Sequence, residues 1–291
     1  MISARCSATI VFARWVFLAL LAGGFSPVPA AGAAPETPSV RIPYFPPMTI
    51  DSGDYNGDGS DEIALFRDST GLWSIRGITR VYFGGGGCYP VPGDYDADGT
   101  AEIAVFRMSA GLWSIRNLTR LYFGSSSDYP APGDYAGDGS CRPAIYRPAT
   151  GMWSIRELTR AYFGDSFDLP AWGYIQGKRA IAVFRPLTGR WAIRGLTRCY
   201  FGVIGEYPVA GKYRGGFGSE IAIFHPAEGL WAVRNATRIY FGGAYDLPAP
   251  ADYNGDGIDD ICTFRPQDGM WSVRNQTRVY FGAVWDIPAT R

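Results

Sequence analysis

The chain has few of the residues on which common enzyme mechanisms and nucleic-acid binding depend. Its 291 residues include one histidine, two lysines and five cysteines, and its formal net charge at pH 7 is zero. A neutral chain lacks the basic excess that attracts nucleic acid or anionic membranes, so we expect neither as a partner. With His225 as its single histidine, the sequence offers no Ser-His-Asp set and no supported Cys-His pair. We therefore expect no enzyme; a carboxylate pair that hydrolyses extracellular polysaccharide is the catalytic alternative.

The cysteines do not form the framework of a disulfide-rich protein. Cys6 lies in the N-terminal segment that we expect to be removed. Cys199 and Cys262 replace small apolar residues of the repeats described below, which predicts buried thiols. Cys88 and Cys141 lie in loops of successive repeats, and they either pair or remain thiols.

The N-terminal segment has the features of an export signal. Residues 1–33 contain two arginines, the short apolar run Trp15 to Phe25 and the small-residue site Ala31-Gly32-Ala33. The run is short for a membrane span, although a retained anchor is the alternative. Residues 34–40 resemble a linker, and the remainder, 41–291, is expected to be secreted or held at the cell surface without membrane insertion.

An internal repeat dominates the rest of the chain. Six tryptophans lie 40 residues apart, except for one interval of 38: Trp73, Trp113, Trp153, Trp191, Trp231 and Trp271. A Tyr-Phe-Gly follows each one and ends at Gly84, Gly124, Gly164, Gly202, Gly242 and Gly282. A period of about 40 residues is typical of propeller blades.

Four short strands are predicted within each repeat. In the second repeat these are Tyr89 to Tyr95, Glu102 to Arg107, Leu112 to Arg116 and Thr119 to Phe123, joined by turns at Met108 to Gly111 and Asn117-Leu118. No long segment has a helical period of apolar residues. The fold class is therefore all-β, a six-bladed β-propeller with four antiparallel strands per blade. An open solenoid is the alternative, but it needs polar capping repeats, and the terminal repeats here are ordinary.

Three loops of the repeat carry a pattern of oxygen ligands suited to Ca²⁺, which prefers six to eight hard oxygens. Positions 1, 3, 5 and 9 offer side-chain oxygens and position 7 a backbone carbonyl. The first loop has Asp54, Asn56, Asp58, the Ser60 carbonyl and Glu62; the second has Asp94, Asp96, Asp98, the Thr100 carbonyl and Glu102; the sixth has Asp252, Asn254, Asp256, the Ile258 carbonyl and Asp260. We predict about three Ca²⁺ sites; an Asp/Gly-rich turn without metal is the alternative.

The other three loops have lost this pattern. The third has Ala136 at position 3 and Arg142 at position 9, and the fifth has Lys212 and Arg214 where ligands would lie. The fourth, Tyr174 to Lys178, has no carboxylate. We interpret these loops, which contain both lysines of the chain, as places where a side-chain cation replaces the ion; a solvated lysine is the alternative.

The sequence resembles FG-GAP/VCBS repeat proteins, a family that includes the integrin α-chain propeller and some fungal propeller lectins. The matching pieces are the Phe-Gly of each Tyr-Phe-Gly, the loop Gly53-Asp-Tyr-Asn-Gly-Asp-Gly59 and the apolar strand after it. The resemblance covers about 41–291 and implies calcium between the first and second strands of a blade. The usual Gly-Ala-Pro is replaced here by Phe-Arg-Pro or a variant, as at Phe184-Arg-Pro186.

Two arginine series recur in every repeat, beginning at Arg76 and Arg80. They either build Arg–Trp pockets for sugars or carboxylates, or have structural roles. The sequons at Asn117, Asn235 and Asn275 are explained by hairpin chemistry, with glycosylation as the alternative.

The two ends of the repeat array resemble parts of a blade. Arg41 to Phe45 resembles a fourth strand, and Trp285 to Ala289 resembles a first strand. One of them is expected to close the ring; alternatively, they polymerise the protein by pairing with a neighbour. From these features we expect an extracellular recognition or adhesion module that binds a glycan or a cell-surface protein, with a self-assembling surface layer or filament as the alternative.

Overall fold

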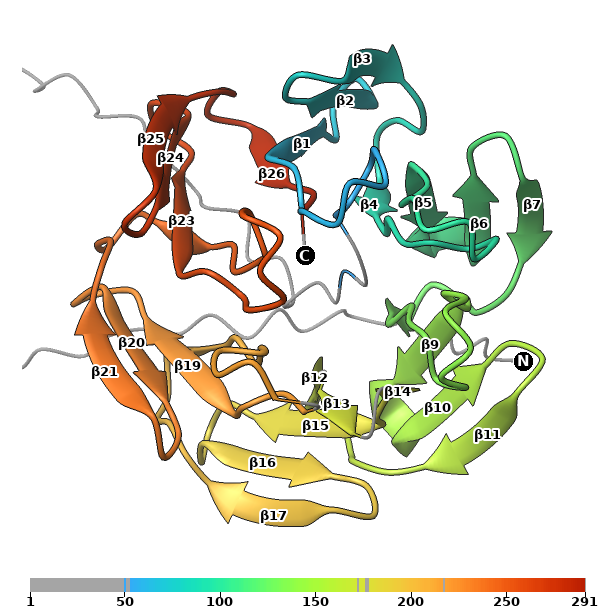
Figure 1. Cartoon of the computed structure of the whole chain (residues 1–291). Helices are drawn as coiled ribbons and strands as arrows, with labels where there is room; N and C mark the ends of the chain where they lie inside the picture. Colours follow the sequence, from blue (N-terminus) through green and yellow to red (C-terminus); the bar gives the residue numbers. More distant parts are fainter. Residues whose placement is uncertain (1–49, 51–52, 172, 176–177, 217, 291) are drawn as a thin grey trace, which may run out of the picture. The chain divides into compact units, whose positions relative to one another are not determined.

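The computed structural model describes residues 50, 53–171, 173–175, 178–216 and 218–290 of the chain. Six four-stranded antiparallel sheets stand in a ring and form a six-bladed β-propeller, which confirms the predicted fold (Figure 1). The expected signal at 1–33, the linker at 34–40 and the strand-like segment 41–45 lie outside the described residues. No helix in the described part of the chain is long and apolar enough to span a membrane.

Each blade runs from an inner strand to an outer strand. The inner strands are β26 (Asp286–Pro288), β4 (Cys88–Pro90), β8 (Tyr129–Pro130), β12 (Leu169–Ala171), β18 (Tyr207–Pro208) and β22 (Leu247–Pro248). The second strands are β1 (Ala64–Arg67), β5 (Ala104–Arg107), β9 (Ala144–Arg147), β15 (Ala182–Arg185), β19 (Ala222–His225) and β23 (Cys262–Arg265). The third strands are β2 (Leu72–Ile75), β6 (Leu112–Ile115), β10 (Met152–Ile155), β16 (Arg190–Ile193), β20 (Leu230–Val233) and β24 (Met270–Val273). The outer strands are β3 (Thr79–Tyr82), β7 (Thr119–Tyr122), β11 (Thr159–Tyr162), β17 (Thr197–Tyr200), β21 (Thr237–Tyr240) and β25 (Thr277–Tyr280).

Three smaller elements complete the described structure. Single 3₁₀ turns, η1 (Met108–Ala110) and η2 (Pro148–Thr150), join the second and third strands of two blades. The fourth blade has an additional two-stranded ribbon of β13 (Tyr174–Ile175) and β14 (Lys178–Arg179).

The C-terminal strand closes the ring. β26 pairs with β1, with Ile287 opposite Phe66, and thereby supplies the inner strand of the first blade. The prediction that one terminal segment completes the ring is confirmed for Trp285 to Ala289. This segment is consequently not a spare strand for a neighbouring molecule. Closure also covers the edge of β1, which would otherwise be an open sheet edge in the first blade.

The repeated tryptophans are the centres of the blades. Each is at most 1 % exposed, and its Nε1–H donates to the carbonyl of the Phe in the following Tyr-Phe-Gly at 2.8–3.0 Å. Each indole also packs on the aromatic ring of the second strand, with centroids 5.0–5.1 Å apart. A buried indole needs a partner for its N–H, and the Tyr-Phe-Gly carbonyl provides it. This bond links the two strongest features of the repeat.

The repeated glycines have a steric cause. Gly111 has φ +59°, and a Cβ there would clash with the Gly124 carbonyl of the same blade. The hairpin between the third and outer strands likewise places Asn117 at φ +63°. Gly, Asn and Glu occupy this position in the six blades, and Gly and Asn accept a positive φ most readily. Hairpin geometry therefore explains the recurring Asn-x-Thr.

The four cysteines that the structure describes are thiols. Cys88 and Cys141 are buried and do not form a disulfide, so the alternative of a bridge between them is wrong. Cys262 is fully buried, as expected for a residue that takes the place of a core alanine.

Candidate metal centre

The predicted ligand loops precede the second strand of each blade, and in every blade except the first they follow its inner strand. Neighbouring loops are joined by backbone hydrogen bonds: Ala101 N–H donates to the Asp54 carbonyl at 2.6 Å, and Cys141 N–H donates to the Asp94 carbonyl at 2.6 Å. Asp61 N–H reaches the Asp252 carbonyl at 2.7 Å, which links the first loop to the sixth across the closure. The carboxylate at position 1 therefore belongs to a residue whose backbone is fixed by the next blade.

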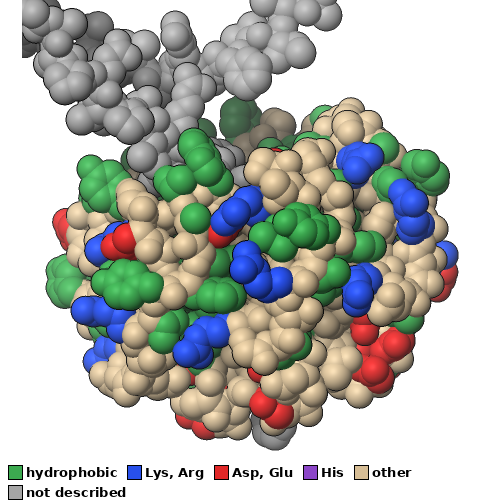
Figure 2. All heavy atoms as spheres, turned by 90° about the horizontal axis from the view of Figure 1, so that it is seen from above, with side chains coloured by type: hydrophobic (Ala, Val, Ile, Leu, Met, Phe, Trp, Pro, Cys, Tyr) green, Lys and Arg blue, Asp and Glu red, His purple; other side chains and the backbone are tan. Residues whose placement is uncertain are grey.

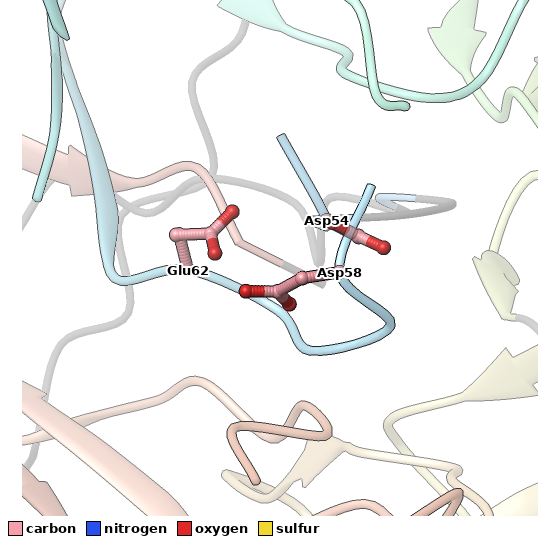
Figure 3. A group of neighbouring side chains, drawn as sticks. All are labelled: Asp54, Asp58 and Glu62. Atoms are coloured by element: carbon pink, nitrogen blue, oxygen red, sulfur yellow. The ribbon is translucent and has the colours of Figure 1, made fainter. Parts of the chain in front are cut away.

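The first loop brings three predicted ligands together. Asp54, Asp58 and Glu62 each offer a carboxylate oxygen, and these oxygens lie within 4.8 Å of one another (Figure 3). Asp54 is held by the backbone N–H groups of Gly57 and Gly59, at 2.7 and 2.9 Å. Such a spacing of carboxylates fits a single hard cation.

The remaining members of the first loop surround these carboxylates. The Asn56 side-chain amide donates to Glu62 at 2.7 Å and to Asp58 at 3.0 Å, so its nitrogen faces the acidic group. The Asn56 side-chain amide must therefore flip, so that its oxygen replaces its nitrogen, before it can be an oxygen ligand. Ser60 donates its backbone N–H to Asp58 at 2.9 Å. The ligand role of the Ser60 carbonyl stays a prediction.

The second loop forms an equivalent group with a different middle member. Asp94, Asp96 and Glu102 offer carboxylate oxygens within 4.8 Å of one another. Asp98 instead accepts hydrogen bonds from the backbone N–H and the hydroxyl of Thr100, at 2.8 and 2.5 Å. Position 3 is an aspartate in this loop, so its side chain offers an anionic oxygen without the amide rotation that Asn56 needs in the first loop.

The glutamates at position 9 show the electrostatic cost of these clusters. Burial, followed by repulsion from Asp58 and Asp54, raises the pKa of Glu62 to about 7, against a hydrogen bond from Tyr55 that lowers it. Burial and repulsion from the neighbouring aspartates likewise raise the pKa of Glu102 to about 7. Carboxyl groups that resist ionisation in this way are stabilised as anions by a bound cation.

The sixth loop is more open than the first two. Among the described residues its acids do not form a group of three carboxylate oxygens within 4.8 Å. Position 9 is Asp260, one methylene shorter than Glu62 and Glu102, and it accepts the Tyr253 N–H at 3.1 Å. Asp252 and Asp256 occupy positions 1 and 5 of this loop, and Asp256 accepts the Ile258 N–H at 2.8 Å. A cation would have to draw this loop inward.

The third loop contains a cation of its own, the Arg142 side chain. The Arg142 guanidinium donates to both carboxylate oxygens of Asp138, at 2.8 and 2.5 Å, and lies 3.9 Å from Asp134. The Arg142 guanidinium lowers the pKa of Asp138 well below its ordinary value. The interpretation that a side chain stands in the place of the ion therefore fits this loop, with arginine as the cation.

The fifth and fourth loops differ from the expectation. In the fifth, Arg214 pairs with Glu220 at 3.2 Å, while Lys212 donates its backbone N–H to Asp259 at 2.8 Å. In the fourth, Arg179 is buried and donates to the Pro132 carbonyl. The Lys178 side chain lies outside the described part of the structure. Among the described residues, the cations paired with carboxylates in the third and fifth loops are therefore arginines.

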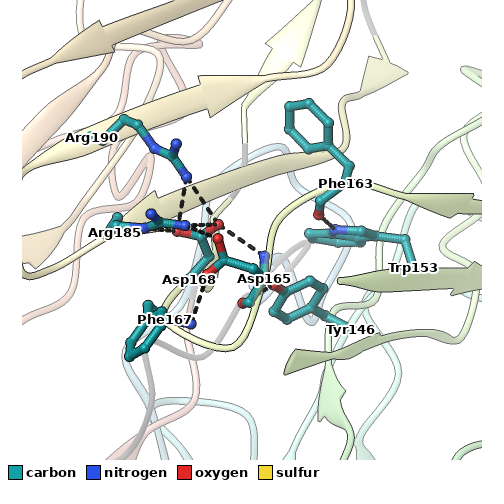
Figure 4. Close-up of polar contacts among 8 residues, drawn as sticks. All are labelled: Tyr146, Trp153, Phe163, Asp165, Phe167, Asp168, Arg185 and Arg190. Carbon is teal, nitrogen blue, oxygen red and sulfur yellow. Dashed lines mark hydrogen bonds and ion pairs between the residues drawn. The ribbon is translucent and has the colours of Figure 1, made fainter. Parts of the chain in front are cut away.

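An ion pair inside the blades was missed by the sequence analysis. In four blades an aspartate next to the inner strand is buried and accepts from the arginine that ends the second strand: Arg67–Asp286, Arg147–Asp128, Arg185–Asp168 and Arg265–Asp246, at 2.6–2.7 Å. Figure 4 shows the fourth blade, where Asp168 also accepts from Arg190 at 3.3 Å. Aligning the repeats shows an acid at this position in five of them, which was the available signal.

The repeated arginines do not form pockets with the tryptophans, because all six indoles are buried. The series from Arg80 instead lies exposed on the outer strands, next to tyrosines such as Tyr82 that are 70–78 % exposed. In Figure 2 basic and apolar side chains lie side by side on the face that is shown.

Cavities lined by described residues lie between blades. One of about 400 Å³ between the fifth and sixth blades is lined by Thr237, Asn254, Asp260 and Arg274, among others, and so shares two predicted ligands with the sixth loop. One of about 210 Å³ lies between the first and second blades.

Comparison of the chain with known protein families, curated proteins and solved structures finds no match.

Proposed function

We propose that the protein is an exported propeller of the FG-GAP/VCBS type that binds Ca²⁺ in the loops of its first, second and sixth blades. In this proposal the calcium-bound ring serves as an extracellular recognition or adhesion module for a glycan or a cell-surface protein. Catalysis has no part in it.

The contrast between the loops carries the proposal. Where the loop contains an internal arginine, as Arg142 in the third blade, the carboxylates are neutralised by the chain itself. Where no arginine is present, in the first and second blades, three carboxylates converge and their glutamates have raised pKa values. Clustered acids of this kind favour an external divalent cation, and oxygen donors at this spacing suit Ca²⁺.

The cavity between the fifth and sixth blades supports a binding role. Its walls contain amide, carboxylate and guanidinium groups, which can hydrogen-bond the hydroxyls of a sugar. Asn254 and Asp260 belong both to this cavity and to the sixth loop. A cation that draws Asp260 inward would therefore change the shape of the cavity, and ligand binding there would depend on calcium.

Isothermal titration calorimetry of the exported form tests the metal sites. We expect uptake of two Ca²⁺ ions by the first and second loops and a weaker third event in the sixth. The variants Asp58→Asn and Asp94→Asn should each remove one tight event. Asp138→Asn in the third loop is the matched control, because its carboxylate is already paired with Arg142 and should not contribute to the stoichiometry.

A glycan array probed with and without calcium tests the recognition role. Binding that requires calcium and is weakened by Arg274→Gln supports the cavity between the fifth and sixth blades. Absence of calcium uptake by the intact protein contradicts the metal sites, whereas calcium uptake without any bound glycan on the array contradicts the glycan role alone and favours a protein ligand.

A further inference from the structure

The second blade departs from the ion-pair pattern of the other blades. At the position of Asp128, Asp168, Asp246 and Asp286 it has Cys88, and at that position the fifth blade has Glu206, which lies 3.3 Å from His225. Cys88 is the direct cross-strand neighbour of Arg107, the arginine that ends the second strand of this blade. The second blade is thus the one blade that keeps the arginine and lacks the acid.

The loss of the acid changes the environment of this arginine. Arg67, Arg147, Arg185 and Arg265 are half-buried against their aspartates, whereas Arg107 is exposed. Arg107 forms no ion pair with any described residue; a hydrogen bond to the Cys88 thiol raises its pKa. A thiol is a weak acceptor, and it leaves most of the hydrogen-bonding capacity of the guanidinium unused.

A cavity opens at this place and contains a second arginine. The space of about 210 Å³ between the first and second blades is lined by Arg107 of β5, Ser114 of β6 and Arg120 of β7. Ser114 lies directly opposite Arg120 in the sheet. Its apolar walls are Phe83, Val105 and Leu112. No acidic side chain lines it, so the two positive charges have no counter-charge within the cavity.

We propose that this cavity binds an oxyanion group, a carboxylate or a sulfate, of an acidic extracellular ligand. The group takes the place that an aspartate side chain has in the other blades, with Arg107 as its bidentate donor. A planar guanidinium with unused N–H donors matches a two-oxygen anion well. Arg120 and the Ser114 hydroxyl supply further contacts, and the apolar walls suit the ring of a sugar.

This inference deepens the proposed recognition function by naming a ligand class, but it does not depend on calcium. The cavity shares no residue with the calcium loops. Anion binding should therefore persist in chelator, which separates a failure of this proposal from a failure of the metal proposal.

The experiment compares three probes that differ in charge: glucuronate, glucose 6-sulfate and glucose. Titration calorimetry at constant chloride, with calcium and with chelator, should show one site for at least one of the two anions and none for glucose. The preferred anion identifies the group as a carboxylate or a sulfate. No binding of either anion overturns the proposal.

Variants locate the site. Cys88→Asp restores the internal acid of the other blades, and we expect it to weaken anion binding at least about tenfold without lowering Tm. Arg107→Gln should weaken binding to the same degree, and it serves as the test if Cys88→Asp does not fold. Arg160→Gln is the control: Arg160 has the position in the outer strand of the third blade that Arg120 has in the second, but it lies outside the cavity, so this variant should bind as the wild type does. Anion binding by Cys88→Asp or Arg107→Gln at wild-type strength overturns the proposal.

Discussion

The loops of the first, second and sixth blades and those of the third and fifth blades occupy the same place in the same fold, yet they balance their charges differently. In the first group, hereafter the acidic loops, carboxylates face one another without an internal cation, as Asp94, Asp96 and Glu102 do. In the second group, hereafter the arginine loops, Arg142 and Arg214 pair with the acids of their own loops. The comparison shows that the chain itself supplies a cation in the arginine loops and supplies none in the acidic loops.

Removal of calcium should have the largest effect and should distinguish the two groups directly. At free calcium of about 100 times Kd, each occupied site stabilises the folded state by about 2.7 kcal/mol. Two sites in a domain of this size correspond to a fall in Tm of roughly 10 °C on chelation. Differential scanning calorimetry with and without chelator measures it. Identical melting curves would contradict the role of the acidic loops.

Moving the arginine from one group to the other should convert an acidic loop. Glu102→Arg places a guanidinium where Arg142 lies in the third blade. We expect this variant to bind one Ca²⁺ ion fewer, to lose about 2.7 kcal/mol of calcium-dependent stabilisation, and to be more stable than the wild type in chelator. Calorimetric stoichiometry and Tm check this result. A variant that keeps the full stoichiometry would show that position 9 is not a ligand.

The pH dependence of the calcium-free protein should come from the acidic loops. The pKa values of Glu62 and Glu102 are raised to about 7 in the folded state, above the ordinary value of 4.5. Between pH 4.5 and pH 7 the folded state therefore retains protons that the unfolded state releases, so these two groups lower the free energy of unfolding as pH rises. After allowance for solvent screening we expect about 1 kcal/mol for each glutamate.

Denaturant unfolding in chelator at several pH values measures this trend. The double variant Glu62→Gln, Glu102→Gln is the control, and the decline attributed to these groups should be absent from it. With calcium present the sign reverses for the wild type, because protons compete with the ion and calcium affinity rises with pH. Equal pH slopes for wild type and double variant in chelator would mean that the two glutamates titrate normally.

Removal of the internal cation should have the smallest effect. Arg142→Gln leaves Asp134 and Asp138 without their guanidinium partner, but Asp138 is exposed to solvent that screens the pair, so we expect only a small fall in Tm. The fall should be the same with and without calcium, because Ala136 leaves the third loop without a ligand at position 3. A calcium-dependent fall would show that the third loop can acquire an ion.

Much of the fold could be predicted from the sequence because the repeat is strict. The tryptophan period gives the number of blades, and each tryptophan meets the carbonyl before the next repeated glycine, so spacing and contact have one cause. Ring closure by Trp285 to Ala289 could also be predicted, because that segment matches the start of a blade. In the candidate site, the positions of the carboxylates in the first two loops followed from their spacing.

Other features depend on geometry that spacing does not contain. The first loop forms a group of three carboxylates, whereas among the described residues the sixth loop, whose position 9 is Asp260, does not. The pairing of Arg147 with Asp128 depends on two strands that lie side by side in the sheet but are 19 residues apart in the chain. The exchange of that acid for Cys88 has a meaning only once the pairing is known, and so the cavity at Arg107 could not be anticipated.

The closing strand also determines when the protein can fold. Asp286 pairs with Arg67 across 219 residues, and Thr290 donates to the Glu62 carbonyl at the end of the first loop. The first blade to be synthesised is therefore the last to be completed, and the carbonyl at the end of its loop gains its Thr290 partner only after β26 has been made. A truncation that removes β26 would act at the opposite end of the sequence, on the first blade and its acidic loop.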